Sequence, residues 1–170
     1  GKGMNGRLTE FLKNEYADVK SDLFSAFTVR CLELLQDKGF SGFMTPFVWM
    51  FLSSYEKLRK HILDNFTLTT LVKPSYTAFF DSAIVAICAF TVQKYYDSSY
   101  KGAFFDLDYL GSAEEQSPRF LQRKESNQYY RACASDFNKI PSSPIAYWLS
   151  DKIRDIFVYS PALSEIADAR

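Results

Sequence analysis

The sequence has 170 residues, of which 47% are hydrophobic and 17% aromatic, so it predicts a folded protein and excludes a disordered chain. Its 20 lysines and arginines balance 20 aspartates and glutamates, and a zero formal charge gives no overall attraction to nucleic acid or to an anionic membrane. Three widely spaced cysteines and one histidine argue against a disulfide framework and against a zinc site, so we expect no metal.

The sequence also lacks membrane and export signals. Its longest apolar run, residues 83–92, has about half the length of a membrane span, and its N-terminus has no signal-peptide pattern. We therefore expect a soluble protein of a reducing cytoplasm, with no membrane partner. Because the chain starts with Gly1 and its last residues carry no obvious stopping signal, we also expect a segment of a longer chain.

The first long helix is predicted over residues 21–38. Ser21 is a good N-cap, and the carboxylate of Asp22 in the first turn suits the positive end of the helix. Gly39 gives a natural C-terminal stop. One apolar stripe at helical spacing is expected to lie in the core, and it consists of Leu23, Phe24, Phe27, Cys31, Leu34 and Leu35.

A short strand follows over residues 40–46. Pro46 ends it, because proline donates no hydrogen bond to a neighbouring strand. Residues 47–52 then lie at the carboxyl end of this strand, where open α/β sheets bind their ligands. They predict either a pocket wall or ordinary core packing of Trp49.

A second helix is predicted over residues 53–64, with His61 on its polar surface. A strand over residues 66–72 follows it. The apolar run over residues 79–93 does not alternate with polar residues, which predicts a strand buried on both faces at the centre of a sheet. The loop before this strand is too short for a parallel crossover, so the two strands should pair antiparallel.

Four segments carry a family resemblance: Lys20 to Phe27, Gly39 to Pro46, Phe79 to Val85 and Pro141 to Ser150. Together they resemble class I methyltransferases that depend on S-adenosylmethionine, in particular the DNA adenine methyltransferases of BREX- and Pgl-type phage-defence systems. The resemblance implies an α/β fold: the C-terminal half of a Rossmann-like methyltransferase sheet, mixed, with an antiparallel last strand. It further implies a division into residues 1–98, from the catalytic domain, and residues 99–170, a connector into a target-recognition region.

The same family carries a glycine-rich motif that binds the cofactor and an Asn-Pro-Pro-Tyr motif that holds the target amine, and neither occurs in this sequence. The resemblance therefore implies that the chain begins just after the Asn-Pro-Pro-Tyr motif and holds no catalytic residue. The intact enzyme would transfer a methyl group from S-adenosylmethionine to N6 of an adenine flipped out of double-stranded DNA. The segment alone would be inactive, with an incomplete cofactor site.

The resemblance also implies roles for four residues. Phe27 would lie against the adenine of S-adenosylmethionine, and Asp22 would help to shape that pocket. Phe80, or its neighbour Phe79, would stack on the flipped adenine, and such stacking contributes about 1 to 3 kcal/mol. The alternative for all three phenylalanines is ordinary core packing.

A basic and aromatic cluster in the second half of the chain is a candidate DNA-binding surface. It consists of Arg119, Arg123, Lys124 and Arg131, interleaved with Phe120, Tyr129 and Tyr130. The same pattern is typical of an ordinary amphipathic surface helix. Residues 103–107 predict another strand, and residues 144–157 predict a helix whose apolar side docks on a domain mostly absent from the chain.

The half-sheet interpretation has a physical consequence. The strand over Phe40 to Pro46 would have an open, flat and apolar edge, which predicts self-association through that edge or a rearranged fold. Two other functions stay open at this point. One is a noncatalytic nucleic-acid-binding or protein-interaction module on a methyltransferase-like scaffold, because a fold does not settle a function. The other is methylation of RNA or of protein glutamine, which related Asn-Pro-Pro-Tyr enzymes carry out.

Overall fold

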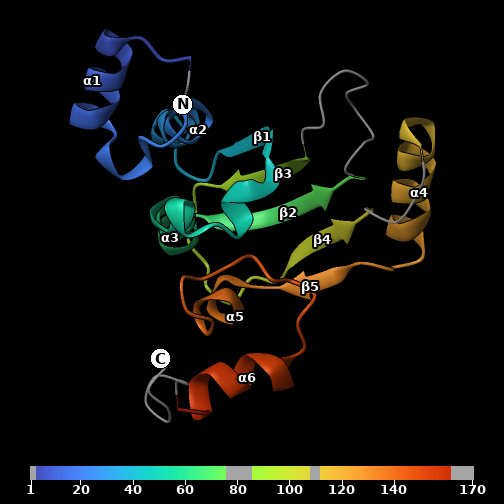
Figure 1. Ribbon diagram of the computed structural model, residues 1–170. Helices are drawn as coiled ribbons and strands as arrows, with labels where there is room; N and C mark the ends of the chain where they lie inside the picture. Colours follow the sequence, from blue (N-terminus) through green and yellow to red (C-terminus); the bar gives the residue numbers. More distant parts are fainter. Residues whose placement is uncertain (1–2, 76–85, 108–111, 162–170) are drawn as a thin grey trace, which may run out of the picture.

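The computed structural model describes residues 3–75, 86–107 and 112–161, which form one five-stranded sheet with flanking helices (Figure 1). The strands are β1 (Phe40–Pro46), β2 (Thr67–Lys73), β3 (Ile87–Gln93), β4 (Gly102–Asp106) and β5 (Tyr130–Ala132). The α-helices are α1 (Gly6–Glu15), α2 (Leu23–Glu33), α3 (Glu56–Asn65), α4 (Ala113–Glu125), α5 (Ala134–Asn138) and α6 (Asp151–Tyr159). Three short 3-10 helices are η1 (Ala17–Val19), η2 (Phe47–Met50) and η3 (Ser53–Tyr55).

The sheet is mixed and open, with the strand order β1-β3-β2-β4-β5. Strand β3 is inserted between β1 and β2 and runs antiparallel to both, so the antiparallel pairing predicted from the short loop is confirmed. Strand β4 is parallel to β2, and β5 is antiparallel to β4. The α/β fold class with an antiparallel last strand is confirmed. The predicted central position of β3 is wrong. Strand β3 lies second in the order, and β2 lies in the middle.

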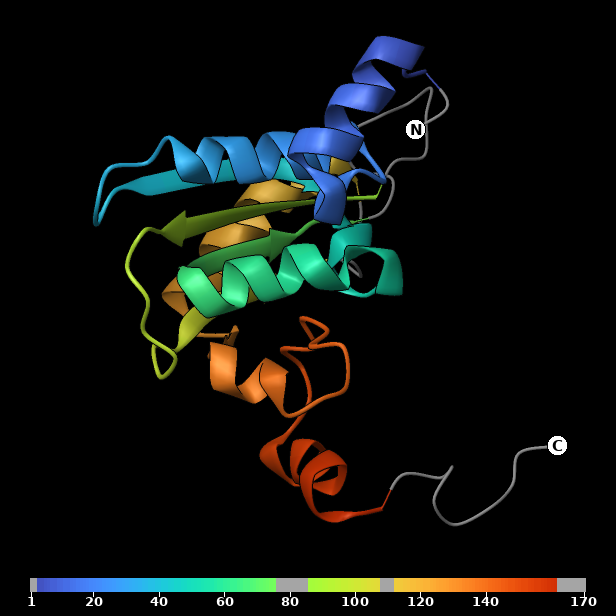
Figure 2. The ribbon, with the colours of Figure 1, turned by 90° about the vertical axis from the view of Figure 1, so that its left-hand side faces the viewer.

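The core lies between the sheet and two helices on one of its faces. Helix α2 contacts β1, helix α3 contacts β2, and both lie on the same side of the sheet (Figure 2). Trp49 of η2 is buried against Phe90 of β3, with ring centroids 4.8 Å apart, so core packing is the outcome for this residue. Helix α4 lies on the opposite side, where Phe120 packs edge-on against Phe105 of β4.

Helix α2 differs from its prediction at both ends and in its buried face. Asp22, and not Ser21, is the N-cap, and the helix ends at Glu33. The buried residues of this helix are Ser25, Ala26, Thr28 and Leu32, whereas Phe27, Cys31 and Leu34 of the predicted core stripe are exposed. Two polar residues can lie on the buried face because their hydroxyls have partners there. Ser25 donates to Val19 O at 2.7 Å and Thr28 donates to Phe24 O at 2.9 Å, so both satisfy their polar groups on the backbone.

Helix α3 buries one polar side chain fully and another partly, although its sequence places both on a surface. Arg59 is fully buried and donates to Trp49 O at 2.8 Å, to Leu52 O at 2.7 Å and, through two nitrogens, to Ser142 O. His61 was expected on the polar surface, but it is half-buried, and its ring packs edge-on against Phe66. Burial lowers the pKa of His61, so the ring is neutral at pH 7.

The C-terminal part continues the same sheet and then leaves it. The strand predicted over residues 103–107 is β4, one residue earlier, and it extends the sheet next to β2. The helix predicted over residues 144–157 is wrong in its first half, because α6 begins at Asp151. Ile145 lies in a non-helical segment fixed to the body, where its amide donates to Met50 O at 2.9 Å. Division of the chain near residue 98 stays a prediction.

Candidate functional site

An apolar groove between α1 and α2 contains the first predicted cofactor contact. Phe27 is 61% exposed and therefore lies outside the core. It faces this groove, whose volume is about 200 Å³, together with Phe11 of α1. The other lining residues are Leu8, Leu12, Tyr16, Leu23, Ala26 and Arg30. Such walls fit a flat aromatic ring on its apolar faces, so the residues present suit the adenine of S-adenosylmethionine. The cofactor role of Phe27 itself stays a prediction.

Asp22 lies at the start of the same helix but does not line the groove. Its Oδ2 accepts a hydrogen bond of 2.7 Å from the hydroxyl of Tyr55, which is 6% exposed. Burial disfavours the ionised form of Asp22, but hydrogen bonding, from Tyr55 among other contacts, outweighs burial and lowers its pKa. Asp22 is therefore a fixed carboxylate beside the groove, and Tyr55 is a partner that the sequence did not indicate.

The two residues predicted to stack on a flipped base, Phe79 and Phe80, lie outside the described residues. A second apolar groove, of about 260 Å³, lies where the carboxyl ends of β1, β2 and β4 meet. Its largest apolar side chains are Met44, Val72, Ile87, Leu107 and Phe120. Because side chains alternate across a strand, Met44 is on the opposite face of the sheet from Phe43. The groove is therefore on the face away from Trp49, and the predicted pocket wall at residues 47–52 does not line it.

The residues of the basic cluster differ in exposure. Arg119, Lys124 and Arg131 are exposed, whereas the guanidinium of Arg123 donates to Asp106 O and is half-buried. The rings of Phe120 and Tyr129 each pack 4.8 Å from Phe105 of β4. Three of the four cations thus face solvent, whereas these two partly buried rings pack against the sheet. DNA contact by Arg119, Arg123, Lys124 and Arg131 stays a prediction.

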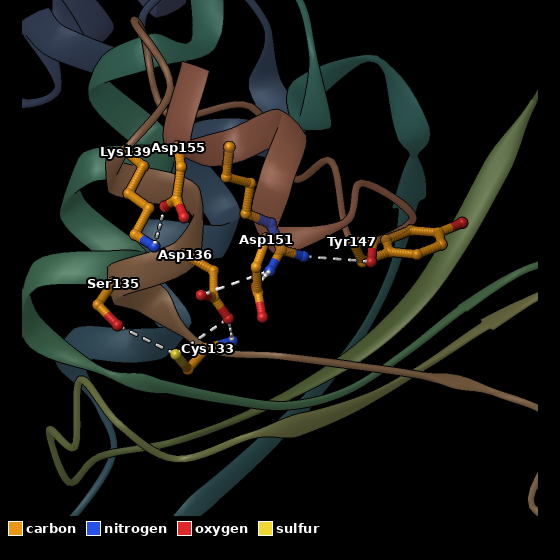
Figure 3. Close-up of polar contacts among 8 residues, drawn as sticks. Cys133, Ser135, Asp136, Lys139, Tyr147, Asp151 and Asp155 are labelled. Carbon is orange, nitrogen blue, oxygen red and sulfur yellow. Dashed lines mark hydrogen bonds and ion pairs between the residues drawn. The ribbon is translucent and has the colours of Figure 1, made fainter. Parts of the chain in front are cut away.

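A polar cluster that the sequence did not predict joins α5 to α6 (Figure 3). Its residues are Cys133, Ser135, Asp136, Lys139, Tyr147, Asp151, Arg154 and Asp155. Buried Arg154 pairs with Asp136 at 3.4 Å and with Asp151 at 3.0 Å, and Lys139 pairs with Asp155 at 2.9 Å. Burial disfavours the ionised form of Asp136, yet its bonds to Cys133 and the nearby cations lower its pKa.

This cluster attaches α6 to the body through charged side chains. The apolar side chains of α6 consequently face away from the body and are exposed: Ile153, Ile156 and Phe157. The outward apolar side agrees with the predicted docking face, although the docking itself is untested. The sequence did not predict the burial of Arg154, because an arginine near two aspartates is typical of a solvated helix surface.

Strand β1 forms one edge of the sheet, with β3 as its neighbour. The amide of Phe47 donates to Ala86 O, so the alternation of an antiparallel ladder directs the backbone groups of Phe40, Gly42 and Met44 towards the open edge. The side chains of Phe40 and Met44 are 63% and 65% exposed. No residue of β1 carries a charge, and its two most exposed large side chains are apolar.

Other kinds of site are not found within the part of the chain that the structure describes. It contains no group of three or more His, Cys, Asp or Glu side chains arranged to hold a metal ion. Each of its helices is too short or too polar to cross a bilayer.

Comparison with known proteins agrees with this architecture. Residues 1–80 match the family model of the Eco57I restriction-modification methylase. The fold resembles the methyltransferase subunit of a type I restriction-modification system from Streptococcus thermophilus, with a TM-score of 0.58 and 13% identity over 78% of this chain and 33% of that one. At this identity the likeness concerns the fold alone.

Two curated proteins match nearly the whole chain. The adenine-specific methyltransferase BrxX of Escherichia coli O9:H4 (strain HS) is 39% identical over 96% of this chain, and the adenine-specific methyltransferase PglX of Lacticaseibacillus casei (strain Zhang) is 33% identical over 96%. The chain spans 13% and 14% of the lengths of these two relatives. The predicted resemblance is confirmed: the chain is related to the adenine-specific methyltransferases BrxX and PglX and to restriction-modification methylases.

Proposed function

We propose that the chain is part of a longer methyltransferase that transfers a methyl group from S-adenosylmethionine to N6 of adenine in double-stranded DNA. The relation to adenine-specific methyltransferases over 96% of the chain carries this proposal. The enzyme would work in the cytoplasm, in restriction-modification or phage defence. Protein glutamine is disfavoured as a substrate because both matched relatives are described as adenine-specific. We favour DNA over RNA because residues 1–80 match a restriction-modification methylase.

Within this function, α2 contributes one side of the cofactor site. The ring of Phe27 lies against the adenine of S-adenosylmethionine, and Phe11 closes the same apolar groove. Asp22 shapes the neighbouring part of the pocket from the N-terminus of α2. When bound, the cofactor supplies an electrophilic methyl group, and this chain holds one end of the molecule that carries it.

The DNA contacts of the proposed enzyme come from two other places in the chain. Phe80, or Phe79, stacks on the flipped adenine, which replaces part of the base stacking lost on extrusion. The exposed charges of Arg119, Lys124 and Arg131 neutralise phosphates, and the half-buried Arg123 holds α4 against the end of β4.

The first prediction concerns activity. The chain alone should transfer no methyl group to adenine-containing duplex DNA, because it lacks the glycine-rich and Asn-Pro-Pro-Tyr motifs. In a calorimetric titration it should show no saturable micromolar binding of S-adenosylmethionine. The longer protein should form N6-methyladenine, measured by mass spectrometry of digested DNA.

Two outcomes would contradict this proposal. Micromolar cofactor binding by the chain alone would show that its site is complete. A longer protein that binds duplex DNA but forms no methylated base with S-adenosylmethionine present would support the alternative, a noncatalytic nucleic-acid-binding module.

We also propose that the isolated chain self-associates through the open edge of β1. An exposed strand edge without charges or a bulge recruits another strand, and the exposed side chains of Phe40 and Met44 add apolar area. In this arrangement the β1 strands of two copies pair antiparallel, and the sheet continues from one copy into the next.

The second prediction tests this edge. Light scattering coupled to size exclusion should show a mass that rises with concentration for the wild-type chain. Met44→Lys should remain monomeric, because a charge beside the edge opposes strand pairing. Leu121→Lys, at an exposed apolar residue of α4, is the matched control and should associate as the wild type does. A monodisperse wild-type monomer at high concentration would refute the proposal.

A further inference from the structure

Asp22 occupies the N-cap of α2 without capping the helix through its side chain. An N-cap aspartate ordinarily accepts a hydrogen bond from an amide of the first turn. Here the amide of Ser25 donates to the backbone oxygen of Asp22 at 3.2 Å, while the carboxylate Oδ2 accepts from the Tyr55 hydroxyl at 2.7 Å. Tyr55, which follows β1, is therefore one of the partners that hold the carboxylate, whereas the first-turn amides of its own helix are not.

Tyr55 is well placed to hold it, because its own ring is fixed. The residue is buried, and its ring centroid lies 5.4 Å from that of Phe24 in α2. Its amide donates to Leu52 O at 3.1 Å. Burial and the bond to Asp22 raise the pKa of the Tyr55 hydroxyl well above its ordinary value, so the hydroxyl keeps its proton and stays a donor.

We propose that Tyr55 is a positioning residue of the cofactor site, which turns the Asp22 carboxylate away from the α2 amides and fixes it beside the groove of Phe27. This inference rests on the proposed cofactor role of Asp22. The contact spans 33 residues of sequence and joins the segment at the carboxyl end of β1 to the start of α2. A movement of that segment would therefore change the position of the carboxylate.

The third prediction tests the contact in the chain itself. Tyr55→Phe keeps the buried ring but removes the donor. The pKa of Asp22, followed by the pH dependence of its carboxyl ¹³C shift, should rise, because a hydrogen bond to the ionised form is lost. Tyr100→Phe is the matched control, since the Tyr100 ring is exposed and its hydroxyl makes no hydrogen bond within the described residues. An unchanged Asp22 pKa in Tyr55→Phe would overturn the proposal.

A second measurement in the longer protein separates this inference from the proposed function. Tyr55→Phe should raise KM for S-adenosylmethionine by about tenfold with little change in kcat, because a displaced Asp22 carboxylate contributes less to binding of the cofactor in ground state and transition state alike. Asp22→Asn should do the same. If Asp22→Asn weakens binding of the cofactor and Tyr55→Phe does not, the positioning role of Tyr55 is refuted, whereas the cofactor role of Asp22 is supported. If neither does while Tyr55→Phe still shifts the Asp22 pKa, the cofactor role of Asp22 fails instead.

Discussion

Replacing Arg59 with methionine should lower the free energy of unfolding by about 3 kcal/mol or more. The Arg59 guanidinium is fully buried and donates four hydrogen bonds to the carbonyl oxygens of Trp49, Leu52 and Ser142. Methionine fills a similar volume but donates none, so carbonyl groups lose their partners in the interior. Urea unfolding followed by circular dichroism measures the change.

The neighbouring Lys60 supplies the control, because it is exposed on the same helix. Lys60→Met should change the free energy of unfolding by less than about 0.5 kcal/mol. Equal stability of the Arg59 and Lys60 variants would show that the four hydrogen bonds only offset the cost of burying the charge.

Replacing Gly102 with alanine should destabilise the fold by about 2 kcal/mol or more. A Cβ at this position would lie 2.5 Å from Leu68 O and 3.1 Å from Thr69 O, both backbone atoms of the neighbouring β2 region. Backbone oxygens cannot rotate away, so β4 would have to move from β2. The midpoint of thermal unfolding measures the loss.

Gly42→Ala is the matched control in β1. Its Cβ would meet only the Thr91 Cγ2 atom, at the ordinary contact distance of 3.6 Å. The variant should be as stable as the wild type or slightly more so, because alanine loses less conformational entropy on folding. If both alanine variants unfold at the same temperature, the close approach of β4 to β2 does not limit the residue at position 102.

The sheet was largely predictable because strong local signals mark it. Gly39 and Pro46 mark the two ends of β1, and both predicted ends are confirmed. The antiparallel pairing of β2 with β3 was predicted from a short loop, and the pairing is confirmed. The reason is not, because β2 ends at Lys73 and β3 begins at Ile87, and the 13 residues between them are enough for a parallel crossover. Insertion of β3 between β1 and β2 was not predicted, because neither the residue pattern nor the loop length specifies which strand lies next to β1.

The buried face of α2 was not predictable from hydrophobicity. Ser25 and Thr28 are polar in the sequence, and only the folded backbone supplies the carbonyl oxygens that let their hydroxyls be buried. Because α2 turns the face with Ser25 and Thr28 towards the core, Phe27 lies on its exposed side. The resemblance placed Phe27 at a ligand surface, whereas periodicity alone placed it in the core.

Arg59 and Tyr55 were missed for a different reason. Each is defined by partners far away in the sequence: Arg59 bonds to Ser142, 83 residues later, and Tyr55 bonds to Asp22, 33 residues earlier. A single arginine or tyrosine at the start of a charged helix gives no local sign of such a contact. Tertiary hydrogen bonds of this kind become visible only in coordinates.

The inserted position of β3 also has a kinetic consequence. Thr45 and Cys88 are in contact across β1 and β3, yet 43 residues separate them, whereas β2 and β3 are joined by a much shorter connection. Closing the longer loop costs more chain entropy before any contact compensates for it. We therefore expect β1 to join last during folding, onto a preformed β2–β3 pair, and early intermediates to expose the unoccupied side of β3.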